Sequence, residues 1–499
     1  MNDRLTVPAE AGRDRWPLLH AIAAVALLLY YMLFPVAPLH GLELYATYGK
    51  LLIAAVTAVY FYRRGFRGCV ELGLVTVFVL WVLISRLLNG DFYLRYDVET
   101  VYGAAVLLIA FSAGLLLDAA GRAKLLNWVS ALFCGFYTLL AAAGIFVFLT
   151  YTYIHLPPEN AWITINDYYG GGSLVALQLL YHRNIASAWL YVALFLLIYQ
   201  FFNCQSRLWR IPITLSALID FVALGLCRCR TVQVAAAISL AMLAMLLVLK
   251  YVHPRKKLAY VPLLALTLAG VTVLGYKGFD LAAQGVSSLS RLTAPAFIQT
   301  YMASDDQLDP EYFGIILEVA EQYENRSDAG ENGAGETGAE ETFGYSDDRD
   351  FLSDASTMTG RSSIWRTVIP AVQQRPQTLL SGQLSRDVLT VPLQYMPGIM
   401  HMHSSPIQTL LLTGLPGLLL AASVMALLIL RLIRVFFSAR PQLSLPVKLL
   451  TVPLTGLMVY SMMESFLFTS SDARSFIFFL LAGAVLGYYY DAYPKTKKQ

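Results

Sequence analysis

Long runs of apolar residues, separated by short polar connections, dominate the chain. Runs of about 20 apolar residues are long enough to cross the hydrocarbon core of a bilayer as a helix. They do not alternate between apolar and polar positions as barrel strands do. We therefore predict an all-α polytopic membrane protein with about 12 transmembrane helices. The predicted spans are 17–36, 48–62, 69–89, 98–120, 125–151, 184–203, 210–226, 231–250, 258–276, 404–430, 446–467 and 475–490.

The composition agrees with this class and excludes several others. Hydrophobic residues make up 57% and charged residues only 14% of the 499 positions, whereas a soluble globular chain carries about 25% charged residues. Intrinsic disorder, collagen and a secreted disulfide scaffold are excluded as classes. We interpret the five cysteines as small buried side chains, because they lie along membrane segments without zinc-site spacing. No motif indicates a metal site, a cofactor or a nucleic-acid partner.

Lysine and arginine are unevenly distributed over the predicted connections. Most of the 36 lie on one side of the membrane, together with both chain ends. The short connections on the other side hold five arginines, which are Arg95, Arg183, Arg228, Arg230 and Arg474. Because basic residues are retained on the cytoplasmic side during insertion, we predict that both termini are cytoplasmic.

The predicted spans divide the chain into three parts. Helices 1–9 occupy residues 1–276, one large external loop occupies 277–403, and helices 10–12 occupy 404–499. Within the loop, 304–354 holds 16 acidic residues and two arginines, which leaves a net charge of +17 on the rest of the chain. We expect this segment to be largely disordered, because it buries too little apolar surface to offset the entropy of ordering. The later part, 358–403, is expected to be ordered and site-forming.

The ordered part of the loop is expected to contain a short helix. Ser362 and Ser363 can cap it, and Pro370 should distort it. Its apolar face would carry Ile364, Val368, Ala371 and Val372.

The external arginines are candidates for binding an anion. Arg228 and Arg230 lie two residues apart at the outer junction between two spans. Guanidinium groups bind phosphate oxygens bidentately, so this pair could clamp a diphosphate. The alternative is that both side chains extend to the lipid headgroups. Arg361 in the loop has the same two interpretations, as an anion ligand or as part of a solvated basic surface.

His403 lies directly before the tenth predicted span, and the residues from Ser404 to Pro406 are typical of a helix start. A histidine at the external face can act as a general base; the alternative is a structural histidine. Two acids, Asp220 and Glu464, lie within or near the end of predicted spans. They fit either an ion-coupled transporter or partners for the arginines.

These residues and their order resemble the O-antigen ligase and O-antigen polymerase superfamily, which are bacterial envelope glycosyltransferases of the GT-C type. The family pattern is a histidine followed at fixed offsets by Asn, Leu, Glu and two glycines. Here His403, Gly414 and Gly417 match in register. Ser404 stands where the family has Asn, and Leu412 where it has Glu.

Two upstream segments extend the resemblance, which covers about residues 227–420. Arg361 and Trp365 match an Arg-Xaa-Xaa-Xaa-Trp-like segment of the family. Arg230 matches an arginine that opens a small-residue-rich span, with Cys229 in place of the usual serine. The twelve spans, the cytoplasmic termini and the loop between helices 9 and 10 also agree with the family.

The resemblance implies a metal-independent, inverting transfer from an undecaprenyl-diphosphate-linked glycan at the external face of the bacterial inner (cytoplasmic) membrane. His403 matches the general base that deprotonates the acceptor hydroxyl, and Arg230 and Arg361 match arginines that hold the diphosphate. We add Arg228 because it adjoins Arg230. The implied partners are the lipid-linked donor, a glycan or glycolipid acceptor and membrane lipids, without a cofactor or nucleic acid.

Two questions stay open at this point. A polymerase and a ligase of this superfamily share their fold and catalytic residues and differ in the acceptor, which the sequence does not reveal. A flippase or transporter of the same lipid-linked glycan is the alternative from another class. It would be built from internal repeats and broken helices, and we find no convincing repeat between the halves of the chain.

Overall fold

The structure of the 499-residue chain is a computed structural model that is almost entirely helical in the part it describes. It describes residues 16–33, 49, 52, 69–89, 94–150, 163–167, 175–179, 183–252, 260–304, 361–366, 368–383, 402–468 and 473–494. The helices before the long loop are α1 (Trp16–Leu33), α3 (Val70–Leu88), α4 (Leu94–Leu116), α5 (Ala119–Thr150), α6 (Arg183–Asn203), α7 (Arg207–Leu226), α8 (Arg230–Tyr251) and α9 (Tyr260–Ser304). Those that follow are α12 (Arg361–Arg366), α13 (Val368–Gln374), α14 (Thr378–Ser381), α16 (Ser405–Phe436), α17 (Leu445–Leu449), α18 (Thr451–Ser461) and α19 (Ala473–Ala492).

Eight of the described helices are long and apolar enough to cross a membrane: α3, α5, α6, α7, α8, α9, α16 and α19. Each coincides with a predicted span, which agrees with a multi-pass membrane protein. Three shorter apolar helices, in α1, in α4 and across α17 and α18, coincide with further predicted spans. The predicted span 48–62 lies outside the described residues apart from Gly49 and Leu52. The total of about 12 therefore stays a prediction.

Helix α19 forms the centre of the bundle, and side chains are buried along nearly its whole length. Glycines let α4 approach it closely. A Cβ atom added to Gly483 would collide with the backbone of Phe111, and one added to Gly114 would collide with the backbone of Leu480. Because lipid tails are as apolar as leucine, helices in a bilayer associate through such close packing rather than through exclusion of water.

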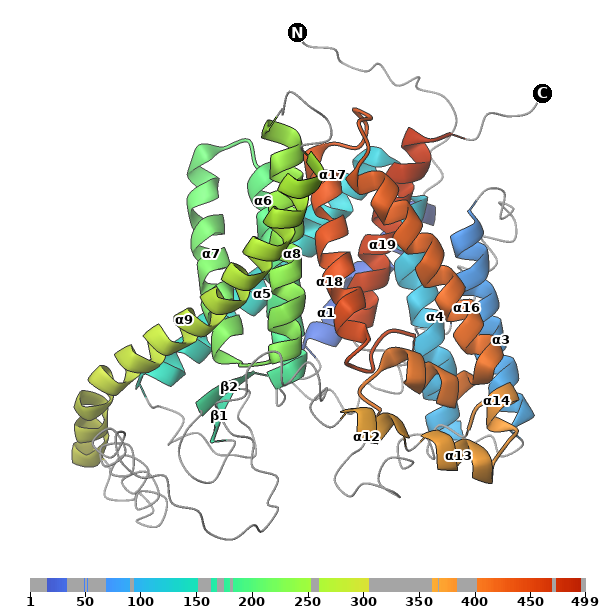
Figure 1. The fold of residues 1–499 in the computed structure, drawn as a ribbon, viewed down its shortest axis with the longest axis horizontal. Coiled ribbons are helices and arrows are strands. Elements are labelled where there is room, and N and C mark those ends of the chain that lie inside the picture. The colour runs from blue at the N-terminus through green and yellow to red at the C-terminus, as the bar shows by residue number, and fades with distance from the viewer. Residues whose placement is uncertain are drawn as a thin grey trace.

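Helix α9 differs from the other long helices in both packing and length. It slants away from the bundle (Figure 1), and no residue of its most apolar 18-residue stretch is buried, whereas Phe279 and Ala283 further along the helix are. Leu266 and Leu274 are among its most exposed apolar side chains. The helix continues past the predicted end of the ninth span at residue 276 as far as Ser304, so part of the predicted loop 277–403 is helical. The rest of the acidic segment 304–354 lies outside the described residues.

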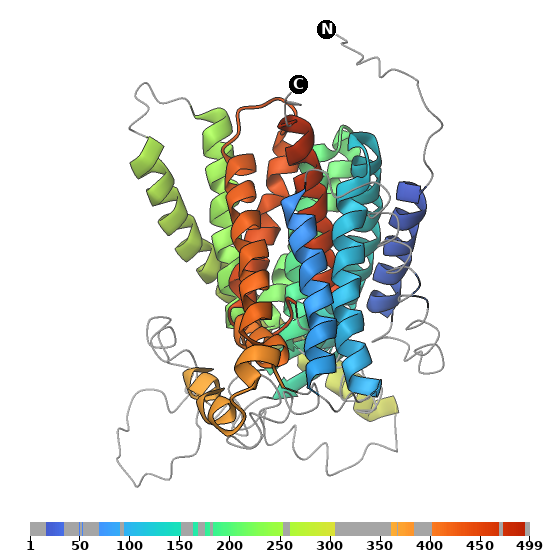
Figure 2. The ribbon, with the colours of Figure 1, turned by 90° about the vertical axis from the view of Figure 1, so that its right-hand side faces the viewer.

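The short helices α12, α13 and α14 gather at one end of the bundle (Figures 1 and 2). The antiparallel hairpin of β1 (Ile163–Asp167) and β2 (Val175–Leu179) lies at the same end, with Ile165 opposite Leu177. The hairpin was not predicted from the sequence. Leu177 and Leu179 are buried, and both lie against α5 where Gly144 leaves room for them.

The opposite end of the bundle holds basic side chains that bind the last turns of α19. Arg431 of α16 donates to Glu71 Oε1 of α3 at 2.8 Å and to the Tyr489 hydroxyl at 2.8 Å. Arg122 of α5 forms an ion pair with Asp491. These contacts join three helices to α19 at the end away from α12–α14.

The close packing of α4 and α19 predicts a specific loss of stability. Gly483→Ala should lower the free energy of unfolding by about 1–3 kcal/mol, because the added methyl group must displace the Phe111 backbone. Gly135→Ala on α5 is the matched control, since no heavy atom lies within 4 Å of its added Cβ and alanine favours a helix. Thermal unfolding of both purified variants in detergent checks this. Equal melting temperatures would contradict it.

Candidate functional site

His403 occupies the connection that leads into α16. Its backbone is left-handed, with φ 46°, a conformation that few non-glycine residues adopt. Ser404 stands at the N-cap position of α16, and its amide donates to Ser465 Oγ at 2.9 Å. The His403 side chain is 21% exposed. Its imidazole is therefore partly exposed at the edge of the packed bundle.

The Ser405 hydroxyl fixes the turn that follows α18 against the start of α16. It donates to the Glu464 carbonyl at 2.8 Å and accepts from the amides of Phe466 and Leu467, both at 3.0 Å. One buried hydroxyl thus binds three backbone groups of a non-helical segment. The position of Glu464 relative to His403 follows from these bonds.

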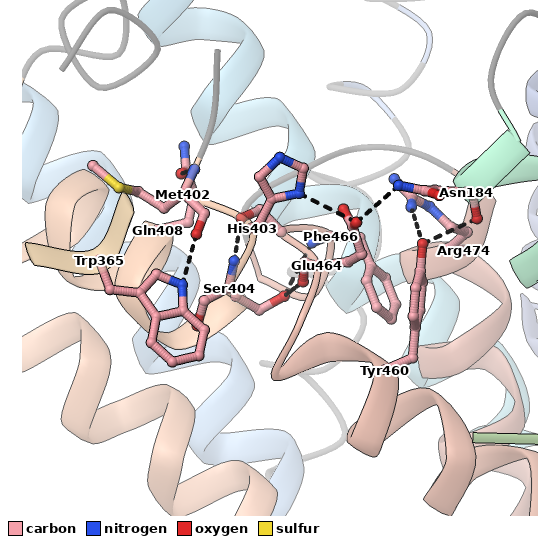
Figure 3. Close-up of polar contacts among 12 residues, drawn as sticks. Asn184, Trp365, Met402, His403, Ser404, Gln408, Tyr460, Glu464, Phe466 and Arg474 are labelled. Atoms are coloured by element: carbon pink, nitrogen blue, oxygen red, sulfur yellow. Dashed lines mark hydrogen bonds and ion pairs between the residues drawn. The ribbon is translucent and has the colours of Figure 1, made fainter. Parts of the chain in front are cut away.

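The Glu464 carboxylate contacts His403 directly (Figure 3). The distance from His403 Nδ1 to Glu464 Oε1 is 3.2 Å, and the Asn184 side-chain amide donates to the same oxygen at 3.1 Å. Only 6% of the Glu464 side chain is exposed. The sequence singled out Glu464 as a partner for arginines or as part of an ion-coupled transporter, and the structure shows its carboxylate in contact with His403 and Asn184. No periodicity or spacing in the chain pointed to this pairing.

Tyr460 and Arg474 extend the network from Asn184 to α19. The Tyr460 hydroxyl donates to the Asn184 carbonyl at 3.0 Å and accepts from Arg474 Nη1 at 3.2 Å. The Arg474 guanidinium also lies over the Phe466 ring, 5.2 Å from its centroid. Figure 3 shows the whole series side by side, from His403 to Arg474. Arg474, one of the five arginines predicted to be external, is therefore a buried member of this network.

Helix α12 docks beside His403. Trp365 Nε1 donates to the carbonyl of Met402 at 2.9 Å, and Ile364 packs with Met402, Leu411 and Leu412 in a small apolar cluster. The expected helix in this part of the loop is present as α12 and α13, and it begins before the predicted serine caps. Arg361 is the first residue of α12. Its backbone is thus brought near His403, and its side chain lies outside the described residues.

Two glycines interlock α14 with a break inside α16. Gly414 has φ 69°, so α16 is not helical there, and Gly382 at the end of α14 has φ 73°. A Cβ atom on Gly382 would collide with the backbone of Leu412, and one on Gly414 would collide with that of Leu380. Helix α16 is therefore interrupted at Gly414. This interruption is the position where the loop rests on α16.

Helix α3 holds this interlock through three polar side chains. Arg86, which is fully buried, donates to the carbonyls of Gln383 and Ser381. Asn89 donates to the Ser381 carbonyl at 3.0 Å. Trp81 Nε1 donates at 2.7 Å to Thr413, whose carbonyl lies next to the helix break. The loop that carries α12 is thus anchored to the membrane helices.

Arg228 and Arg230 lie in the turn between α7 and α8, at the same end of the bundle as His403. Arg228 has φ 49°, and Arg230 begins α8. Gln233 closes the turn by donating to the carbonyls at the end of α7. Cys229 of this turn is buried and stands at the N-cap position of α8.

The intramembrane Asp220 does not pair with these arginines. Its Oδ2 accepts from Thr138 Oγ1 at 3.2 Å, between α7 and α5. Among the described residues no group of three or more His, Cys, Asp or Glu side chains could hold a metal ion. The chemistry offered at this end is therefore a partly exposed imidazole, a buried carboxylate and several guanidinium groups.

The Trp365 hydrogen bond predicts how firmly α12 is held beside His403. Trp365→Phe removes the donor to the Met402 carbonyl and keeps an aromatic ring, which should cost about 1 kcal/mol locally. Amide hydrogen exchange in 361–374 and 402–412 should then be about fivefold faster. Trp209→Phe is the matched control, because Trp209 is 67% exposed on α7. Unchanged exchange in both segments would show that this bond does not hold the loop.

Comparison of the chain with protein-family models gives no match, and a search of curated proteins gives no match either. The functional argument therefore rests on the residues of this chain and on their geometry. Three features carry it: the contact between His403 and Glu464, the docking of α12 beside His403, and the arginine-bearing turn between α7 and α8.

Proposed function

We propose that the protein is a membrane glycosyltransferase that transfers or polymerises an undecaprenyl-diphosphate-linked glycan at the external face of the bacterial inner membrane. The observation that carries the proposal is the position of His403. Its partly exposed imidazole contacts a buried carboxylate at the end of the bundle where α8 and α12 begin. Both of these helices begin with arginine, Arg230 in α8 and Arg361 in α12.

In the proposed reaction His403 removes the proton from a hydroxyl group of the acceptor sugar. The hydroxyl oxygen attacks the anomeric carbon of the donor, and the bond from that carbon to the lipid diphosphate breaks with inversion. The proton stays on the imidazole, and the electron pair leaves with the diphosphate. Arg230 and Arg361, with Arg228 beside them, stabilise the charge on the leaving group, because guanidinium groups bind phosphate oxygens strongly.

The distribution of charge supports the proposed orientation. The end that bears Arg122 and Arg431 would face the cytoplasm, because basic residues are retained there. His403 and the arginine-bearing helix starts would then face outward. A lipid-linked donor fits this arrangement, since its tail can lie in the bilayer while its charged head meets the external surface.

Polymerase and ligase activities are both compatible with this site, and we favour a polymerase because we see no feature specific to a lipid A-core acceptor. A flippase for the same glycan is the rival function. The interlock of Gly382 with Gly414 favours surface chemistry over transport, because it fixes the loop on α16 next to the site. A transporter would instead be expected to move such elements past each other.

Reconstitution in liposomes with a lipid-diphosphate oligosaccharide separates these functions. Gel analysis of the glycan should show a ladder for a polymerase or one transfer to a second acceptor for a ligase. Glycan that is unchanged but moved between leaflets would identify a flippase and contradict the proposal.

The proposed base predicts a large loss of rate in one variant. His403→Ala should lower kcat by about 10²–10⁴, the usual contribution of a general base. Donor binding should change little, because the arginines remain. If His403→Ala turned over at the wild-type rate in the liposome assay, His403 would not be the general base.

The proposed diphosphate site predicts a loss of kcat/KM in variants of its arginines. Arg230→Ala should lower kcat/KM by about 10–100-fold, because a charge-assisted hydrogen bond contributes about 1.5–3 kcal/mol. Arg230→Lys should recover only part of this, because it keeps the charge but loses the planar fork. Arg207→Ala is the matched control, since Arg207 begins α7 at the opposite end of the bundle. Equal kcat/KM for the two alanine variants would contradict the site.

A further inference from the structure

We infer that Glu464 is a positioning residue that sets the tautomer of His403. Its carboxylate accepts the Nδ1–H of the imidazole and leaves Nε2 as the atom that takes the proton of the acceptor hydroxyl. This inference rests on the proposed function for the identity of that proton, but the tautomer itself can be measured without any substrate.

The geometry determines which imidazole nitrogen carries hydrogen. An ionised carboxylate can only accept hydrogen bonds, whereas one nitrogen of a neutral imidazole donates and the other accepts. Glu464 Oε1 lies 3.2 Å from His403 Nδ1. The hydrogen therefore belongs on Nδ1, and the lone pair belongs on Nε2.

The second contact of the carboxylate supports its role as an acceptor. Asn184 Nδ2 donates to the same Oε1 at 3.1 Å, and both bonds meet on that oxygen in Figure 3. The Asn184 backbone is held in turn by the Tyr460 hydroxyl, which is held by Arg474. Side chains from α6, α18 and α19 thus fix the carboxylate before any substrate binds.

Because Glu464 is buried, its negative charge interacts more strongly with the His403 imidazole. Its side chain is 6% exposed and that of His403 is 21% exposed, so solvent screens the pair less than it would on an open surface. When His403 takes up a proton, the carboxylate next to Nδ1 stabilises the imidazolium that forms. Glu464 thus acts on the reaction through His403 rather than through the substrate.

Glu464 supplies the carboxylate beside His403, and position 412, where the resembling family has Glu, is apolar in this chain. Leu412 is buried in the apolar cluster with Ile364 and Met402, so α16 offers no carboxylate there. The turn after α18 supplies one instead, and Ser405 binds the backbone of that turn to the start of α16.

Glu464→Gln tests the inference with little change in shape. The amide oxygen can still accept from Asn184, but the negative charge is lost and the amide nitrogen can donate to Nδ1. We expect kcat to fall by about 10²-fold while KM changes less than about twofold. In a His403→Gln background the same substitution should cause no further loss, because Glu464 would act only through the imidazole. An equal loss in both backgrounds would overturn the inference.

The tautomer of His403 can also be measured in the absence of substrate, which tests the inference independently of activity. The chain has seven histidines, so ¹⁵N-histidine spectra of the full-length protein, with His403→Gln to assign the signal, report the tautomer of His403. The wild type should show the Nδ1–H form, and Glu464→Gln should shift it towards Nε2–H. Glu71→Gln, which alters a buried carboxylate at the opposite end, should leave the His403 signal unchanged.

The outcomes separate the two proposals. A wild-type Nε2–H tautomer, or no change in Glu464→Gln, overturns the positioning role whatever the activity. The expected tautomers in a protein that transfers no glycan would support the positioning role and overturn the proposed function. Glu464→Asp serves as a second variant, because it keeps the charge but withdraws it by one methylene group. It should retain more activity than Glu464→Gln.

Discussion

Backbone groups that a helix releases where it ends or breaks within packed protein are shielded from water, and other protein groups must therefore bind them. The candidate site is built from such breaks. Ser405 binds the turn after α18, Trp81 binds the carbonyl beside the kink at Gly414, and Gln233 closes the turn between α7 and α8. At each break the chain leaves helical geometry, and a buried polar side chain binds the backbone groups that are released.

This constraint explains why the polar side chains of the candidate site are held by several hydrogen bonds. The carboxylate of Glu464 is held through its own backbone by Ser405 and through its side chain by Asn184. Buried polar networks are costly when they are incomplete and specify one arrangement when they are satisfied. The same side chains that satisfy released backbone groups therefore also orient His403, so stability and chemistry depend on one set of bonds.

Hydropathy alone predicted the membrane class and the approximate position of the described spans, because long apolar runs reflect a local constraint. The candidates His403, Arg228, Arg230 and Arg361 came instead from their residue types, their predicted external positions and the family resemblance. The partner of His403 could not be read in this way. Glu464 lies 61 residues further along the chain, and Asn184 lies 280 residues before Glu464. Contacts over such separations depend on how helices pack, which no periodicity records. The hairpin β1–β2 and the continuation of α9 were missed for a related reason, since both lie in connections where hydropathy carries little signal.

The bond between Asn184 and Glu464 has a consequence for the biogenesis of the protein. A ribosome delivers helices to the membrane in order from the N-terminus, and α6 is inserted long before the turn that carries Glu464 has been synthesised. Arg474, which completes the network, arrives later still at the start of the last helix. The nascent chain consequently holds only separated parts of the candidate site throughout most of translation. The network therefore cannot form before α19 has been synthesised.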